Sequence, residues 1–347
     1  MALLEIRGLT VSFGTSRTPL IAVDHLDFAI DAGEIVGLVG ESGSGKSVTA
    51  LAVLGLVDFP GKVTCTQLTF DGRELPALSA AGRRAMLGGK LAMIFQDPLA
   101  SLDPCYTVEY QLGEALRLHG GTAERRSAKA RRARALELLR QVEIPDAPAR
   151  LRAYPHQLSG GMAQRVMIAI ALAGQPRLLI ADEPTTALDV TVQAQVLDLL
   201  VRLAEERGMA LVLITHDLAV VAETAHRVVV MYAGQAVESG PLPALFDAPR
   251  HPYTKALLEA LPEHNRGRAR LQAIPGVVPG ARDRPPACLL APRCPFARAR
   301  CTVEAPPFTG AEGRRARCHF PLDASGRPGN DWATAAPLPV PAAEGVR

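Results

Sequence analysis

The 347-residue chain has no long hydrophobic run, no strong excess of charge and no Cys-x₂-Cys pair. No apolar stretch approaches the roughly 18–20 residues that a membrane-spanning helix needs, so we expect none to cross a bilayer. The net charge is only +3, which is too small to indicate a nucleic-acid partner. The first residues lack the basic-then-apolar pattern of a secretory signal, and we therefore expect a cytosolic protein.

The composition is that of an ordinary soluble globular protein, with 48% apolar and 21% charged residues. The length allows one large domain and a smaller one. The Arg-rich stretch 125–134 lies in an Ala/Leu/Glu helical pattern, so we interpret it as a solvated helix face. No internal repeat is present, which indicates one copy of the main domain.

A glycine-rich phosphate-binding loop is the first strong motif. It reads Gly40-x-x-x-x-Gly45-Lys46-Ser47, after a buried-strand pattern at Ile35–Val39 and before a helical pattern up to residue 56. In such a loop the backbone N–H groups surround the phosphates of a nucleotide, the lysine contacts the β- and γ-phosphates, and the serine hydroxyl is a Mg²⁺ ligand. A chance glycine-rich turn is the alternative, and the strand–loop–helix context argues against it.

Two carboxylates follow a second apolar strand, predicted at 178–181. Asp182 should lie at the carboxyl end of a parallel strand, where open α/β sheets bind ligands, and it should hold Mg²⁺ directly or through water. Glu183 should then accept the proton of an attacking water. A purely structural pair of capping carboxylates is the alternative.

The phrase Leu158-Ser159-Gly160-Gly161 lies between these two motifs and opens a helical pattern. Ser159 is suited to be the N-cap, and the free N–H groups that follow it can bind an anion. One chain cannot easily close both this phrase and its own glycine loop on the same nucleotide.

In this order, the three motifs resemble the nucleotide-binding subunits of ATP-binding cassette (ABC) transporters over roughly residues 1–320. The resemblance implies an α/β P-loop NTPase fold with a RecA-like core, an N-terminal β-subdomain and a helical subdomain, plus a small cysteine-containing C-terminal extension. It also implies ATP hydrolysis at a composite site, because in this family the Ser-Gly-Gly phrase acts on the nucleotide of a partner cassette.

Further site residues follow from the same resemblance. Gln96 matches the family's glutamine at the Mg²⁺ and water site, His216 its switch histidine, and Asp189 the aspartate of the loop at the dimer interface. Phe13 stands where the family places an aromatic that stacks on adenine, although a core phenylalanine on an N-terminal strand is the alternative. The predicted catalytic residues are Glu183, His216 and Gln96; the Mg²⁺ ligands are Ser47, Gln96 and Asp182; the nucleotide-binding residues are Phe13, Gly40, Ser42, Gly43, Ser44, Gly45, Lys46, Ser47, Val48, Ser159, Gly160 and Gly161.

Longer phrases resemble the ATPases of dipeptide and oligopeptide importers. These phrases are residues 96–104, 154–162, 181–195 and 251–258, the last reading His-Pro-Tyr-Thr-Lys-Ala-Leu-Leu. The resemblance implies two transmembrane permease subunits, a second ABC ATPase subunit that forms a heterodimer with this one, an extracytoplasmic peptide-binding protein and a peripheral position at the cytoplasmic face of the membrane. Nickel importers share much of this sequence, so nickel or another small solute is an alternative cargo. A non-transport ABC ATPase is a more distant alternative function.

Four of the six cysteines lie in the C-terminal extension, at Cys288, Cys294, Cys301 and Cys318. Their spacing does not match the close pairs of structural zinc sites, and disulfides are disfavoured in a reducing cytosol. In the resembling importers, some members carry a four-cysteine iron–sulfur cluster here, which implies a [4Fe–4S] cluster; zinc or four free thiols are the alternatives. We expect a cassette at 1–240 with its helical subdomain at about 98–175, the extension at 241–322, and a disordered tail at 323–347.

Overall fold

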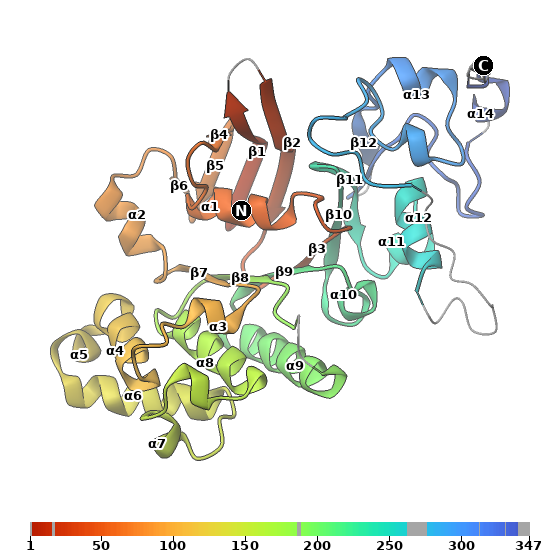
Figure 1. The fold of residues 1–347 in the computed structure, drawn as a ribbon. Helices are drawn as coiled ribbons and strands as arrows, with labels where there is room; N and C mark the ends of the chain where they lie inside the picture. The colour runs from red at the N-terminus through yellow and green to blue at the C-terminus, as the bar shows by residue number, and fades with distance from the viewer. Residues whose placement is uncertain are drawn as a thin grey trace, which may run out of the picture.

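The computed structural model describes residues 2–15, 18–185, 189–261, 276–311, 313–329 and 331–338. Figure 1 shows three regions around a central sheet: an N-terminal β-region, a group of helices, and a C-terminal region at the opposite end from those helices.

The central sheet carries the site. Its parallel strands are β3 (Ile35–Val39), β7 (Leu91–Ile94), β8 (Leu178–Asp182), β9 (Ala210–Thr215) and β10 (Arg227–Tyr232). Neighbouring strands follow the order β10-β3-β9-β8-β7, so β3 and β8 both flank β9. Both faces of the sheet are covered, which explains why these strands are continuous apolar runs.

Alternation along β8 divides the hydrophobic core. Leu179 and Ala181 pack in a cluster with the helical region, whereas Leu178 and Ile180 pack in a second cluster with α1 (Lys46–Leu54) and the N-terminal strands. Successive side chains of a strand point to opposite faces, so each core strand contributes to both clusters.

The N-terminal strands form a separate antiparallel sheet. It contains β1 (Leu4–Thr15), β2 (Thr18–Ile30), β4 (Lys62–Thr64), β5 (Gln67–Phe70) and β6 (Arg73–Glu74). The sequence pattern predicts two short strands separated by Gly8. The structure instead has one strand, β1, in which Gly8 adopts a φ of 60° and the pairing with β2 shifts register.

A helical region lies between β7 and β8. Its elements are α3 (Pro98–Ser101), α4 (Val108–His119), α5 (Thr122–Arg126), α6 (Ala128–Gln141), α7 (Ala147–Arg150) and α8 (Gly160–Leu172). Helical spacing over residues 123–142 predicts one helix, but the structure interrupts it at Ser127, whose extended backbone ends α5 and whose side chain caps α6. Helices α2 (Ala80–Met86), α9 (Val190–Arg207) and α10 (Leu218–Thr224) complete the cassette.

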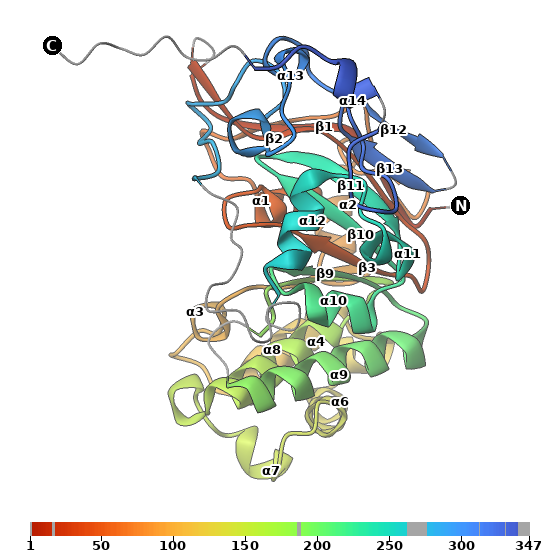
Figure 2. The same ribbon diagram turned by 90° about the vertical axis from the view of Figure 1, so that its right-hand side faces the viewer.

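The C-terminal extension continues the central sheet. After β11 (Gln235–Pro241) come α11 (Ala244–Asp247), α12 (Pro252–Glu259), α13 (Ala299–Val303), β12 (Phe308–Ala311), β13 (Arg314–Arg317) and α14 (Asp331–Thr334). Strand β13 pairs with β11 through Glu238↔Ala316 and Ser239↔Arg315, so the sheet runs on into β13 and β12. Figure 2 shows β12, β13, α13 and α14 of the extension at the far end of the molecule from the helical region.

The prediction that the tail is disordered is wrong for the part of the tail that the structure describes. Residues 323–329 and 331–338 have a defined structure, including α14. The Trp332 indole donates to the Phe296 carbonyl at 2.8 Å, and the Arg298 guanidinium lies 3.6 Å from the Trp332 ring. An aromatic anchor and a cation–π contact therefore hold this segment on the extension, which its Pro/Ala-rich composition did not indicate.

Candidate functional site

The phosphate loop has the shape that its glycines predict. Gly40, Gly43 and Gly45 have φ values of 154°, 78° and 97°, in the range that glycine tolerates best. A side chain could not be added at two of these positions: a Cβ would lie 2.2 Å from the Met231 carbonyl oxygen at Gly40 and 2.7 Å from that of Ala22 at Gly45. The backbone of the loop therefore lies close against β10 and β2.

Lys46 begins α1 inside this loop. Its ammonium donates to the carbonyls of Gly40, at 2.8 Å, and Glu41, at 3.1 Å, and its side chain is buried. Burial lowers the pKa of Lys46, while the carboxylates of Glu183, Asp182 and Glu41 act in the opposite direction. A partly desolvated cation among anions is suited to binding a triphosphate.

The two predicted Mg²⁺ ligands from distant motifs meet. The Ser47 hydroxyl donates to the Asp182 carboxylate at 3.0 Å, although 135 positions separate them in the chain. Asp182 is only 5% exposed, and burial raises its pKa. An oxygen pair of this kind, one neutral and one acidic, fits a hard cation such as Mg²⁺, whose charge would offset the burial of the carboxylate.

Glu183 is held between the two other predicted catalytic side chains. Its Oε2 accepts a hydrogen bond from the Gln96 amide at 3.0 Å, and its Oε1 lies 3.4 Å from Nδ1 of His216. The Glu183 backbone has a φ of 44°, uncommon for a non-glycine residue, and its N–H donates to the Ile214 carbonyl at 2.9 Å. The turn after β8 therefore sets where this carboxylate points.

One cavity of about 620 Å³ unites these groups. Its lining comes from β2, the loop after β3, the start of α1 and the residues after β7, β8 and β9, and consists of Ala22, Glu41, Ser42, Gly43, Ser44, Gly45, Lys46, Ser47, Val48, Gln96, Glu183 and His216. Parallel strands present their carboxyl ends at one edge, which explains why residues so far apart in the sequence converge here. Glu41 and Ala22 were not predicted; Glu41 lies inside the recognised loop, but Ala22 carries no signal of its own.

Ser159, Gly160 and Gly161 lie outside this cavity. Ser159 caps α8 by accepting a hydrogen bond from the Met162 N–H at 3.3 Å, and Gly160 is exposed at the start of the helix. The Ser159–Gly161 segment therefore lies apart from the lining that the chain's own glycine loop contributes, and its binding of a phosphate stays a prediction.

Two further predicted residues also lie outside the lining of the cavity. Phe13 packs partly buried against the N-terminal core, close to Gly61, so its stacking on adenine stays a prediction. Asp189 caps α9 by accepting from the Val192 N–H at 3.0 Å. Residues 186–188, which complete the motif before it, lie outside the described residues.

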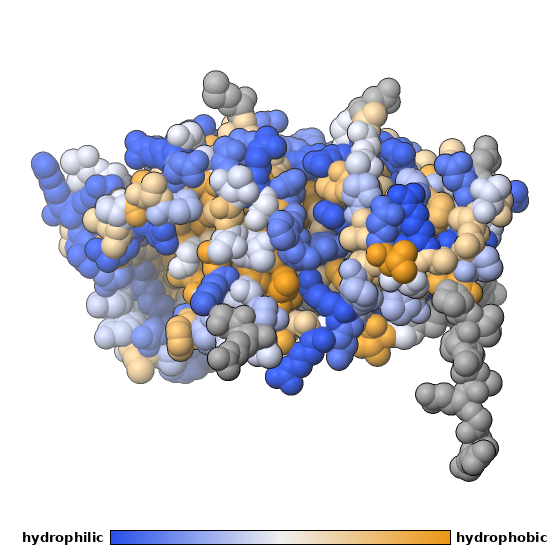
Figure 3. Space-filling view, turned by 90° about the horizontal axis from the view of Figure 1, so that it is seen from above, coloured by the Kyte–Doolittle hydropathy of each residue, from blue (hydrophilic) through white to orange (hydrophobic). Residues whose placement is uncertain are grey.

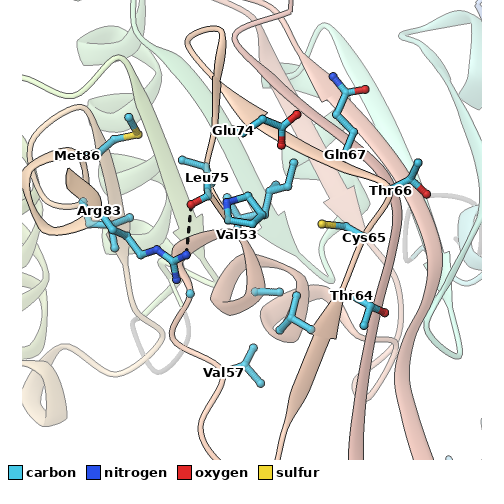
Figure 4. Close-up of a pocket in the computed structure, with 16 residues that line it drawn as sticks. Val53, Val57, Thr64, Cys65, Thr66, Gln67, Glu74, Leu75, Arg83 and Met86 are labelled. Atoms are coloured by element: carbon cyan, nitrogen blue, oxygen red, sulfur yellow. Dashed lines mark hydrogen bonds between the residues drawn. The ribbon is translucent and has the colours of Figure 1, made fainter. Parts of the chain in front are cut away.

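A second cavity of about 620 Å³ lies between α1, α2 and the β4–β5 strands (Figure 4). Its polar side chains include Cys65, Gln67, Glu74 and Arg83, and the Arg83 guanidinium donates to the Leu75 carbonyl at 3.2 Å. Its lining contains no glycine loop and no paired carboxylates, so its size alone does not make it a nucleotide site.

The four C-terminal cysteines are brought together. Cys301 is buried, the others are half-buried, and the Cys288 N–H donates to the Cys301 carbonyl at 3.1 Å. Burial raises the pKa of Cys294 and of Cys318 to about 12, and the neighbouring cysteines contribute to both shifts. Among the described residues, no three or more His, Cys, Asp or Glu side chains are arranged to hold a metal ion.

The hydropathy of the helices and of one face of the molecule can be described together. In the described part of the chain, no helix is long and apolar enough to cross a membrane. The face formed by the N-terminal sheet and the extension is predominantly hydrophilic, with apolar residues in small groups (Figure 3).

Comparison with known proteins identifies two families along the chain. Residues 23–186 match the ABC transporter family, and residues 237–301 match the C-terminal region of oligopeptide/dipeptide transporters. The dipeptide transport ATP-binding protein DppD of Escherichia coli is 57% identical over 94% of this chain and 99% of its own length. DppD of Haemophilus influenzae is 53% identical over 94% of this chain and 98% of its own length.

More distant relatives agree. A putative peptide import ATP-binding protein of Brucella abortus is 49% identical over 91% of this chain and 94% of its own length. Among solved structures, the dimeric ATP-binding cassette MJ0796, in a post-hydrolysis state with ADP and phosphate, is 30% identical with a TM-score of 0.61. The match covers 69% of this chain and 98% of that structure.

Proposed function

The chain belongs to the ABC transporter family, as the ATP-binding subunit of a dipeptide or oligopeptide importer, and we propose that the cleft lined by Lys46, Glu183 and His216 is where it hydrolyses ATP. The observation that carries this proposal is the convergence on one cavity of the glycine loop and of the residues that follow β7, β8 and β9. The Ser47–Asp182 hydrogen bond and the Gln96–Glu183–His216 contacts bring four separate segments within reach of one triphosphate.

Each residue then has a chemical role. The loop N–H groups and Lys46 bind the β- and γ-phosphates, and Ser47, Asp182 and Gln96 hold Mg²⁺, directly or through water. Glu183 accepts a proton from the water that attacks the γ-phosphorus while the bond to the β-phosphate oxygen breaks, which releases ADP and phosphate. His216, at the end of β9, contacts the γ-phosphate and responds to its loss.

A partner cassette completes the site. The separation of Ser159–Gly161 from the cavity, together with the dimeric state of the MJ0796 cassette, supports a dimer in which each Ser-Gly-Gly phrase binds the nucleotide of the other subunit. ATP then stabilises the closed dimer, and hydrolysis removes that stabilisation. In the importer, the partner is a second, related ATPase subunit, and both dock on two permease chains at the cytoplasmic face, supplied by an extracytoplasmic peptide-binding protein.

We also propose that the four cysteines hold an iron–sulfur cluster, with zinc or four free thiols as the alternatives. The charges of Cys294, Cys288 and Cys301 act on the pKa of Cys318, which supports their proximity. Four thiolates are the usual ligand set of a [4Fe–4S] cluster. Cys288, Cys294, Cys301 and Cys318 would hold it, and when bound it would cross-link the extension. Iron and sulfide analysis with the absorption spectrum of anaerobically purified protein tests this assignment.

Uptake of a labelled dipeptide tests the transport function. Cells that depend on this importer should lose uptake when the chain carries Glu183→Gln and retain it with the native chain. If the native chain supports no dipeptide uptake but restores uptake of nickel, the alternative cargo is correct.

A further inference from the structure

An arginine of the C-terminal extension reaches the phosphate loop. The Arg293 guanidinium pairs with the Glu41 carboxylate, with N–O distances of 3.2 and 3.4 Å, across 252 positions of sequence. The same guanidinium lies 3.3 Å from the Tyr232 hydroxyl, and the Arg293 side chain is only 7% exposed. Glu41 is the second residue of the loop and lines the nucleotide cavity.

The His-Pro-Tyr phrase supplies a second contact with the same loop residue. The Tyr253 hydroxyl accepts a hydrogen bond from the Glu41 backbone N–H at 2.9 Å. The Tyr253 ring is fully buried and lies against the Tyr232 ring, with a centroid distance of 4.7 Å. Main chain and side chain of Glu41 are therefore both bound by residues that follow the cassette.

A buried carboxylate fixes the position of this tyrosine. Glu238, on β11, accepts the backbone N–H groups of Arg250 at 2.7 Å and His251 at 3.0 Å. The His251 imidazole in turn accepts the Tyr253 N–H at 3.2 Å and caps α12. These hydrogen bonds restrict the backbone at the start of α12, and they therefore fix the position of the Tyr253 hydroxyl that accepts the Glu41 N–H.

The Arg293–Glu41 pair solves an electrostatic problem of the loop. An unpaired Glu41 carboxylate would repel a triphosphate in the same cavity and compete with it for the Lys46 ammonium, whose pKa the charge of this carboxylate already raises. A guanidinium on that carboxylate removes much of the repulsion. The Tyr253 contact adds order to a glycine-rich segment, so less conformational entropy is lost when the nucleotide binds.

We propose that Arg293 and Tyr253 are positioning residues through which the C-terminal extension keeps the phosphate loop competent for ATP. The inference rests on the proposed binding of ATP in this cleft. According to this inference, the extension not only covers the edge of the central sheet but also raises the affinity of the cleft for ATP.

A double-mutant cycle in the full-length protein tests the electrostatic part. Binding of a fluorescent ATP analogue with Mg²⁺ is measured for the native protein, Arg293→Gln, Glu41→Gln and the double variant. We expect Arg293→Gln to weaken binding about tenfold in the native background and by less than about threefold once Glu41 is neutral. Tyr253→Phe, which keeps the ring but removes the acceptor, should weaken binding about fivefold.

Arg298→Gln is the matched control. Arg298 belongs to the same extension but stacks on Trp332 and does not line the nucleotide cavity, so this variant should bind the analogue like the native protein. Equal affinity of Arg293→Gln and the native protein would overturn the inference. So would an equal loss in both Glu41 backgrounds, because that result indicates general damage to the extension. If the native protein itself binds no nucleotide, the proposed function fails instead.

Discussion

Replacing Glu183 by glutamine separates chemistry from binding. The new side chain would have the size of the native one, and its amide oxygen could still accept the hydrogen bond that Gln96 donates at 3.0 Å. What is lost is the charge that accepts the proton of the attacking water. Removal of a general base typically lowers a rate by about 10²–10⁴-fold, which corresponds to about 3–5 kcal/mol of transition-state stabilisation.

ATP affinity should survive the same change. The phosphate contacts come from the glycine loop and Lys46, and loss of a nearby anion does not weaken them. We expect affinity within about threefold of the native value, while kcat falls about 10²–10⁴-fold. A closed cassette dimer should then accumulate with ATP, because the step that opens it has been removed.

The assay is steady-state phosphate release by the assembled importer, with nucleotide affinity measured on the same preparations. Glu223→Gln, at an exposed position on α10, is the matched control and should leave both quantities unchanged. Phosphate release by Glu183→Gln within about twofold of the native rate would refute the role of Glu183 as base. An equal loss of affinity and rate would instead place Glu183 in ground-state binding.

Three further outcomes are expected. Lys46→Ala should weaken MgATP binding by at least about tenfold, because it removes the buried cation of the loop, and equilibrium binding measures this directly. Alkylation of metal-free protein should modify exposed Cys105 quickly and Cys294 slowly: with a pKa of about 12, roughly one Cys294 thiol in ten thousand is ionised at about pH 8. Mass spectrometry of the labelled cysteines distinguishes the two rates. Burial raises the pKa of Glu238, so the folded protein retains this proton after the unfolded chain has lost it. The stability contribution of Glu238 is thus complete at acid pH and declines as pH rises, and urea unfolding should show a smaller decline for Glu238→Gln.

The residues of the proposed ATP cleft can be predicted because each belongs to a local sequence motif, and the parallel sheet brings these motifs together. Strand β3, the glycine loop and α1 are adjacent in the sequence, and Asp182 ends a strand whose apolar run is unambiguous. Once the sheet is parallel, the carboxyl ends of its strands must meet, and the convergence of Gln96, Glu183 and His216 follows.

Contacts between distant segments could not be predicted in this way. The phosphate-loop motif defines the positions of its glycines and lysine but leaves the residue at Glu41 open, so no pattern pairs it with Arg293. Strand β13 reads Arg-Arg-Ala-Arg, without the alternation that marks a half-buried strand, and its identity comes from pairing with β11. Phe13 is a different case. It was predicted from its position in the family alone, and it does not line the cavity.

The continuation of the sheet through β11 and β13 also limits how this protein can be truncated. The sequence suggests a convenient boundary near residue 240, and a shortened cassette ending there would keep every ATP motif. Such a product would lose β13 and so leave β11, still paired with β10 on its other side, as a free sheet edge at Glu238 and Ser239. Exposed edges of this kind recruit other chains, so a shortened cassette would be prone to aggregate even though its nucleotide motifs are complete. Preparations made for crystallisation or for fusion to a reporter should retain the chain through β13.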